Sequence, residues 1–141
     1  MNAENVDIQI SLKSIWWRDP PYCEIYIDDR VIDRLHVTNK EGEDLHSRDV
    51  YFRNDLSYGD HRLVIRYLNK KDDDDHYDSE GYVIKSQSLL VKQVIINRFN
   101  VCLDHNVTFN SKPYASELIF ENGDWVLNFS VPTYLWLMEN T

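Results

Sequence analysis

The segment VDIQISLKSIW, residues Val6–Trp16, decides the fold class because apolar and polar side chains alternate along it. The even positions from Val6 to Leu12 are aliphatic, whereas the odd positions between them include Asp7 and Gln9. A period of two is typical of a β-strand with one buried face, since successive side chains point to opposite faces of a sheet. The segment therefore predicts a strand that packs on a hydrophobic core.

Similar runs follow along the chain. Turn residues separate them about every ten residues, and helical periodicity is almost absent. Many short strands with frequent turns are typical of two packed antiparallel sheets. We therefore predict an all-β protein, an antiparallel β-sandwich of the jelly-roll kind. The further expected strands span residues 23–28, 30–37, 48–55, 61–69 and 88–101.

Two pairs of residues are expected to interrupt these strands. Pro20 and Pro21 cannot donate hydrogen bonds to a ladder, so they predict a loop or bend after the first strand. Asn97 and Arg98 predict a turn within the run 88–101, followed by a second short strand.

The C-terminal part of the chain contains the clearest turn signal. The dipeptide Asn122-Gly123 favours a type I′ turn, in which both central residues need positive φ. Its flanking runs, 117–121 and 124–129, alternate as the arms of a hairpin do. The apolar run that follows fits a short helix and a docked tail equally well. We therefore expect a β-sandwich domain over residues 1–103, and a C-terminal hairpin with a docking tail over residues 104–141.

The composition favours one globular domain that binds neither nucleic acid nor membrane. With 24 acidic and 15 basic residues among 141, the formal net charge is −9, which repels phosphates unless the bases cluster. The adjacent pair Lys70-Lys71 is followed directly by aspartates, so no basic patch is expected. No run approaches the roughly 20 apolar residues of a membrane span, and no signal-peptide pattern is visible.

Catalytic motifs are absent from the sequence, so we do not expect an enzyme. The four glycines are too sparse for a phosphate-binding loop, and no serine lies in a nucleophile elbow. The five histidines lack the paired spacing of a helical zinc site. Cys23 and Cys102 are too few for a disulfide framework, and we expect both to be buried thiols.

An acidic segment between two expected strands is the strongest candidate for a metal site. Calcium prefers six to eight oxygen ligands, including carboxylates, on a flexible loop. A solvated loop explains the same residues, because adjacent carboxylates in water repel each other by only about 1 kcal/mol. No motif requires a cofactor, and calcium is the ion that this loop suits. The candidate ligands are Asp72, Asp73, Asp74, Asp75 and Asp78.

Aromatic side chains provide candidate contact surfaces. Trp16 and Trp17 are adjacent, so on an extended strand they point to opposite sides. Together with Tyr22, an exposed tryptophan could stack on a sugar ring or anchor a partner protein. The alternative is that both rings cover the open end of the sandwich. Trp125 is expected in the core on a hairpin face, and Trp136 within the apolar tail.

The apolar tail is a candidate docking segment. Its side chains Tyr134, Trp136 and Leu137 would be costly to leave exposed, so we expect them to contact a partner.

A longer pattern lies between Gly59 and Val101. It consists of a G-x-H-x-L-x-I strand, an aromatic residue, an asparagine, an acidic loop and a second apolar strand. The matching positions are Gly59, His61, Leu63, Ile65, Tyr67, Asn69, Asp72 to Asp78, and Leu90 to Ile96. In this pattern the chain resembles small β-sandwich proteins of tailed bacteriophages, which are themselves similar to calcium-dependent xylan-binding modules. The ending PTYLWLMEN is similar to the aromatic tail of some of these phage proteins.

The resemblance implies two functions. The first is a structural component of a phage capsid, neck or tail, which docks on other virion proteins in several copies and assembles in the host cytoplasm. Edge strands and an apolar tail suit such assembly. The alternative is a carbohydrate-binding module, calcium-dependent in the family, that recognises glycans on the host surface. In that case Trp16, Trp17 and the acidic loop would contact the sugar.

Overall fold

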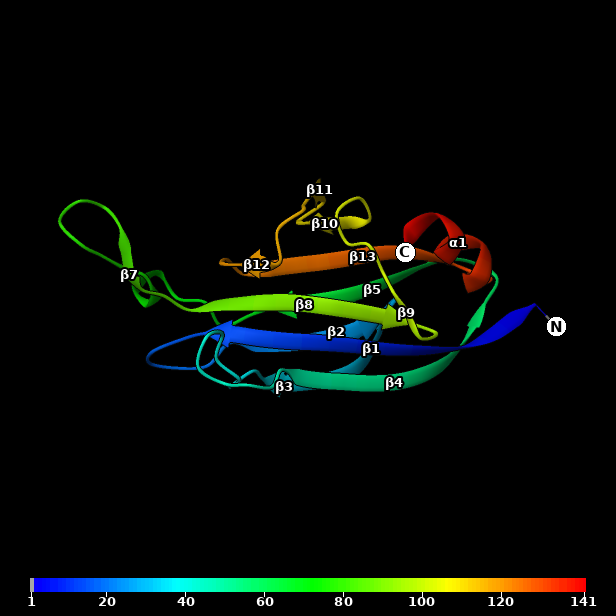
Figure 1. Cartoon of the computed structure of the whole chain (residues 1–141), viewed down its shortest axis with the longest axis horizontal. Coiled ribbons are helices and arrows are strands. Elements are labelled where there is room, and N and C mark those ends of the chain that lie inside the picture. Colours follow the sequence, from blue (N-terminus) through cyan, green and yellow to red (C-terminus); the bar gives the residue numbers. More distant parts are fainter. Residues whose placement is uncertain (1) are drawn as a thin grey trace.

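The computed structural model describes residues 2–141. The chain forms two antiparallel sheets packed face to face (Figure 1). The predicted all-β sandwich is confirmed. The five-stranded sheet has the order β12-β8-β1-β4, with β9 also paired to β8. Its strands are β1 (Ala3–Ile15), β4 (Arg48–Ser57), β8 (Ser88–Ile96), β9 (Phe99–Asn100) and β12 (Leu118–Ile119).

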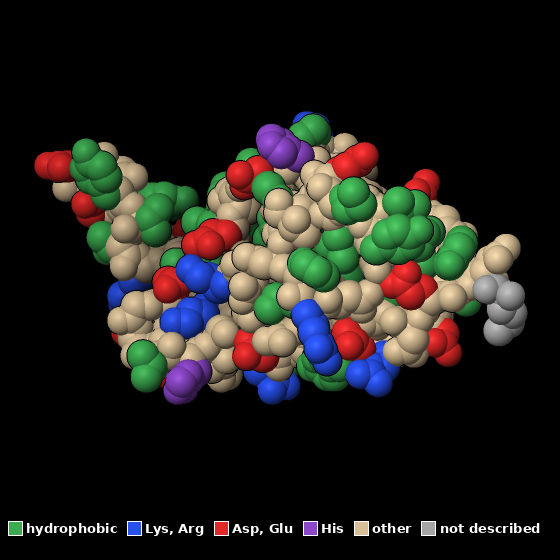
Figure 2. Space-filling model, turned by 45° about the vertical axis from the view of Figure 1, so that its right-hand side comes forward, with side chains coloured by type: hydrophobic (Ala, Val, Ile, Leu, Met, Phe, Trp, Pro, Cys, Tyr) green, Lys and Arg blue, Asp and Glu red, His purple; other side chains and the backbone are tan. Residues whose placement is uncertain are grey.

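The six-stranded sheet has the order β11-β10-β13-β5-β2-β3. Its strands are β2 (Tyr22–Ile27), β3 (Arg30–His36), β5 (Gly59–Tyr67), β10 (Val107–Phe109), β11 (Lys112–Pro113) and β13 (Gly123–Val131). A separate arm, formed by β6 (His76–Tyr77) and β7 (Val83–Lys85), projects from one end of the sandwich (Figures 1 and 2). A short 3₁₀ helix, η1 (Asp72–Asp74), precedes the arm, and the helix α1 (Thr133–Asn140) ends the chain.

The alternation along β1 explains its central place in the five-stranded sheet. Val6, Ile8 and Ile10 are fully buried against the opposite sheet, whereas Asp7 and Gln9 lie on the outer face and are half-buried. Each aliphatic side chain that is removed from water in this way contributes about 1.5–3 kcal/mol to folding.

Three large side chains fill the core between the sheets: Trp125, Tyr67 and Phe129. The expected core position of Trp125 is confirmed. Cys23 is also fully buried, and burial raises the pKa of its thiol to about 12. Cys102 is only half-buried, which differs from the expectation, because it lies in the irregular segment between β9 and β10.

The hairpin expected at Asn122-Gly123 is not formed, because its two arms lie in different sheets. The first arm contributes β12, which pairs with β8, and the second is β13, which pairs with β5. The Asn122 side chain instead bonds both the backbone N–H and the carbonyl of Lys70. A C-terminal hairpin does exist between β10 and β11, where Asn110 and Ser111 have the positive φ angles of 49° and 70° that a type I′ turn requires.

The turn expected at Asn97 and Arg98 is confirmed. These residues have φ angles of 48° and 72°, and they join β8 to β9.

The boundary expected after residue 103 does not separate two units in the structure. β13 lies inside the six-stranded sheet and pairs with β5 from Gly123 to Val131. Its inward side chains belong to the same core as those of β1. Because β13 pairs with β10 on one side and with β5 on the other, the C-terminal residues complete the six-stranded sheet.

The apolar tail forms the helix α1, which resolves the two alternatives left by its sequence. Glu4 of β1 holds the start of the helix, because its carboxylate accepts hydrogen bonds from the backbone N–H of Thr133, at 3.0 Å, and from the Thr133 hydroxyl. Asn97 donates a third bond to this carboxylate at 2.8 Å. Within residues 2–141, no helix has the length and apolar character that a bilayer crossing requires.

Candidate functional site

A notch in the edge of β8 is the candidate site. β12 pairs with Leu89 and Leu90 of this strand, and β9 pairs with Ile95 and Ile96, so neither edge strand covers the residues between them. Opposite the gap, the ladder with β1 shifts register between Ser11 and Leu12. The two local effects leave Lys92 and Gln93 at an open, bulged part of the sheet.

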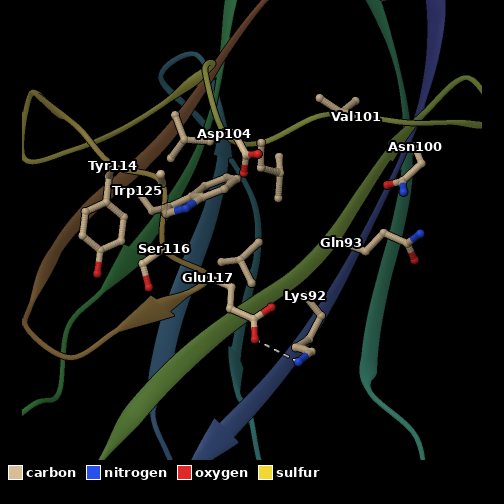
Figure 3. A pocket seen from close by; sticks show the side chains of 13 residues that line it. Lys92, Gln93, Asn100, Val101, Asp104, Tyr114, Ser116, Glu117 and Trp125 are labelled. Carbon is tan, nitrogen blue, oxygen red and sulfur yellow. Dashed lines mark hydrogen bonds and ion pairs between the residues drawn. The ribbon is translucent and has the colours of Figure 1, made fainter. Parts of the chain in front are cut away.

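Two connecting segments and one buried ring enclose this β8 notch. Asn100 of β9 with the segment 101–104 after it, and the segment 114–117 before β12, form its walls, and Trp125 of β13 lies at its floor. The cavity has a volume of about 320 Å³. In Figure 3, Gln93 and Asn100 lie on one side, and Tyr114, Ser116 and Trp125 lie on the other.

An ion-pair triad braces one end of the notch. The Lys92 ammonium lies 2.6 Å from Glu41 Oε2 and 3.0 Å from Glu117 Oε1. Its hydrogen bonds to Glu41 and then Glu117 raise the pKa of Lys92, and the bond from Lys92 lowers the pKa of Glu41. The lysine is therefore charged at neutral pH and neutralised by protein groups. With Asp104 also on the rim, the notch carries no excess positive charge.

The lining of the notch suits a small polyhydroxylated ligand. The side-chain amides of Gln93 and Asn100 can both donate and accept hydrogen bonds, and the Ser116 hydroxyl can do the same. Trp125 closes the floor of the notch, but this residue is only 1% exposed, so the polar groups of the rim are the ones available to a ligand. A pocket of this size with a few convergent polar groups is typical of small-molecule binding sites. None of its lining residues is a histidine or a cysteine.

The sequence analysis missed the notch because it arises from distant segments. The lining residues come from β8, β9 and the segment after it, β10, the segment before β12, and β13. The local signal is the adjacent pair Lys92-Gln93, which interrupts the apolar run of this strand.

The acidic loop is ordered by ion pairs and is not a simple solvated loop. Asp74 is only 1% exposed, and its carboxylate accepts a 2.6 Å bond from Arg18 and a 2.7 Å bond from the Lys71 backbone N–H. Arg18 also binds Asp73 through two nitrogens, and these bonds lower the pKa of Asp73. Lys70 pairs with Asp75 at 2.7 Å.

The arrangement of these carboxylates does not fit a calcium ion. Asp78 accepts bonds from the backbone N–H groups of Glu80 and Tyr82, so it closes its own turn. Across residues 2–141, no group of three or more acidic, histidine or cysteine side chains is gathered in a metal-binding arrangement. Calcium would have to displace Arg18 from Asp73 and Asp74. The structure therefore does not bring the five predicted ligands together.

The predicted aromatic contacts lie at separate places. The Trp17 indole donates a 2.8 Å bond to the Asp74 carbonyl, and Arg18 and Lys85 lie over its ring at 5.0 Å and 4.7 Å from the centroid. Trp17 thus joins the loop after β1 to the acidic loop. Trp16 is half-buried, with Lys40 over its ring at 4.2 Å.

Tyr22 lies apart from both tryptophans. It is half-buried on β2, where its ring contacts His36 and its hydroxyl donates to Glu24.

The predicted docking residues of the tail divide into two groups. Leu137 is buried, and Trp136 packs edge-on against Phe129, so both contact this chain's own core. Tyr134 is exposed, as is Met138. Helix formation explains the difference, since residues three or four apart share a face and the remaining residues face outward.

The chain is a β-sandwich, and its fold resembles that of solved carbohydrate-binding modules. It is similar to vCBM60 solved in complex with galactobiose, with a TM-score of 0.53 and 11% identity over 86% of this chain and 98% of that chain. It is also similar to the selenomethionine form of vCBM60, with a TM-score of 0.55 and 10% identity over 86% and 89% of the two chains. The second structure is described as part of an evolutionary link, by circular permutation, between two families of calcium-dependent carbohydrate-binding modules.

At these identities the likeness establishes the fold alone. No family model matches the sequence, and no curated protein matches it.

Proposed function

We propose that this protein is a non-catalytic carbohydrate-binding module that holds a neutral sugar in the β8 notch. The observation that carries the proposal is the notch itself, with its polar rim above Trp125 and its volume of about 320 Å³. The fold that surrounds it is shared with modules solved as carbohydrate-binding proteins. A sugar ring has hydroxyl groups that can bond the rim amides and the Ser116 hydroxyl.

The charges of the notch favour a neutral sugar over an acidic one. Lys92 is held between two glutamates, and Asp104 adds a further carboxylate. A uronic acid would meet these negative groups without a free cation to bind. We therefore expect neutral mono- or disaccharides as ligands.

The expected affinity is modest. At roughly 0.3 kcal/mol for each of the roughly 12 to 23 non-hydrogen atoms of a mono- or disaccharide, the dissociation constant lies between about 10 μM and 2 mM.

A glycan array with and without calcium, followed by calorimetry on the ligands that bind, tests this function. Asn100→Ala and Gln93→Ala each remove a hydrogen-bonding partner from the rim, and each should weaken binding by about 2- to 10-fold. Asn128→Ala is the matched control, because Asn128 is exposed on the six-stranded sheet outside the notch. Failure of every saccharide to bind at millimolar concentration would refute the function.

A third variant distinguishes the notch from the site expected from the sequence. Trp17→Ala should leave sugar affinity unchanged, since Trp17 does not line the notch. If Trp17→Ala abolishes binding while the rim variants bind normally, the sugar binds beside the acidic loop.

A second candidate function is protein docking, which the surface of α1 favours. We propose that, if the protein is part of a virus particle, it docks on another virion protein through this surface. An apolar groove of about 600 Å³ runs between α1 and the β9 turn, lined in part by Phe99, Tyr134 and Met138. These side chains are 57%, 64% and 80% exposed. Figure 2 shows hydrophobic side chains gathered on this part of the surface.

Mass spectrometry of purified phage particles tests the docking role. The chain should be present in particles, and a Tyr134→Ser, Met138→Ser double variant should be incorporated less. Both residues are exposed, so the fold should persist, which circular dichroism can verify. Absence of the chain from particles would contradict a virion role and leave the sugar-binding proposal untouched.

A further inference from the structure

The free edge of β4 differs from the other edges of the two large sheets. β4 pairs with β1 over ten residue pairs without a register shift, and its other side has no partner strand among residues 2–141 (Figure 1). β3 is also an edge strand, but a register shift interrupts its ladder with β2. The remaining edge strands β9, β11 and β12 are two residues long.

Natural proteins usually protect long edge strands from pairing with another chain. The usual devices are proline, charged side chains (lysine above all), bulges and short length. The sequence of β4, RDVYFRNDLS, contains neither proline nor lysine, its ladder has no bulge, and its charged side chains are of both signs, so they can pair with those of a second copy. An edge of this kind is therefore suited to pairing with a further strand.

The side chains of β4 show which strand fits. Asp49, Tyr51 and Arg53 alternate on the outer face and are exposed. If two copies of β4 pair antiparallel around Tyr51, Asp49 of each copy lies opposite Arg53 of the other, and the two tyrosines face each other. Two-fold symmetry makes both charge pairs form together.

The buried face of the strand is consistent with the same register. Val50 would lie opposite Phe52 of the second copy, and both are apolar. A register shifted by two residues in one direction would instead oppose Asp49 to Asp55, which is repulsive. Asp49 receives a hydrogen bond from Ser47 and has no ion pair with another part of residues 2–141, so it is available to a second copy.

We propose that the protein forms a two-fold symmetric dimer through antiparallel pairing of β4 with β4 of a second copy, with Asp49 paired to Arg53 across the interface. The two five-stranded sheets then join into one continuous sheet. In each copy β8 and β4 lie on opposite sides of β1, so pairing through β4 leaves the β8 notch uncovered. The dimer would therefore display two notches. The inference does not depend on the proposed sugar binding.

Sedimentation velocity over a range of concentrations, on wild-type protein and charge-reversal variants, tests the dimer. Arg53→Asp and Asp49→Arg each convert two attractive pairs into two repulsive ones and should weaken dimerisation by about 10-fold or more. The double variant Asp49→Arg, Arg53→Asp restores both pairs and should recover dimerisation.

The double variant also separates dimerisation from folding. Arg53 bonds Asp7 within its own chain, so both variants that carry Arg53→Asp lose that contact and some stability. The double variant should therefore recover dimerisation but not the stability lost with the Arg53–Asp7 contact. A wild type that stays monomeric to millimolar concentration overturns the proposal, and so does a wild-type dimer that the single reversals leave intact or that the double variant does not recover.

Discussion

Replacing Asp74 by asparagine tests whether the acidic loop is a structural element. The substitution keeps the size of the side chain but removes its charge and replaces one acceptor oxygen by an N–H₂ donor. In the structure Oδ1 accepts from Arg18 and Oδ2 accepts from the Lys71 backbone N–H, so the new amide must face one of these donors. One buried hydrogen bond is lost and the other is weakened.

The magnitude follows from burial. Asp74 is 1% exposed, and a hydrogen bond to a charged group contributes about 1.5–3 kcal/mol. Arg18 is about one-third exposed and keeps its two bonds to Asp73, which reduces the loss on its side. We expect Asp74→Asn to lower the free energy of unfolding by about 2–3 kcal/mol.

Urea unfolding at pH 7, monitored by tryptophan fluorescence, measures this change. Asp72→Asn is the matched control, because Asp72 is exposed on the same 3₁₀ helix and should change stability by less than about 0.5 kcal/mol. Equal stability of the two variants would refute the structural role of Asp74.

Three further predictions concern protonation, the C-terminal helix and calcium. Burial lowers the pKa of His61, but its hydrogen bonds and the charge of Asp28 outweigh burial and raise it; the stabilisation is therefore complete below the unfolded pKa of about 6.5 and is lost as pH rises through the folded value. Chemical unfolding between pH 6 and 9 should show this loss in the wild type and a smaller one in His61→Gln. An equal pH dependence of the free energy of unfolding in the two proteins would contradict the prediction. Glu4→Gln should destabilise the protein by about 1–2 kcal/mol through its lost bonds to Thr133, unlike Glu139→Gln on the exposed side of α1, and a thermal melt compares the two. Millimolar calcium should give no binding heat and leave the melting temperature unchanged, whereas a saturable heat would show that the acidic loop rearranges around the ion.

Local patterns predicted the parts of the fold that local physics decides. The alternation in β1 identified its buried face, and Asn97 with Arg98 identified a turn whose positive φ angles are observed. Asn122-Gly123 has the same local preference for a turn. The Asn122 side chain instead bonds the Lys70 backbone, so tertiary contacts override the type I′ turn expected there.

The candidate site could not be predicted because it depends on pairing between distant segments. Arg18 meets Asp74 across more than fifty residues of sequence, and no periodicity signals that contact. The notch exists because β9 and β12 cover only the two ends of β8. Which part of an edge stays open follows from the whole topology and not from the composition of the strand.

Sugar binding in the β8 notch is the central claim, and an NMR titration tests it most directly. The four tryptophans provide four indole N–H signals, of which only that of Trp125 belongs to the notch. Titration with galactobiose and a panel of neutral disaccharides should shift the Trp125 indole signal together with the Gln93 and Asn100 side-chain amides. Shifts confined to the indole of Trp17, or no shift with any saccharide at millimolar concentration, would contradict the claim.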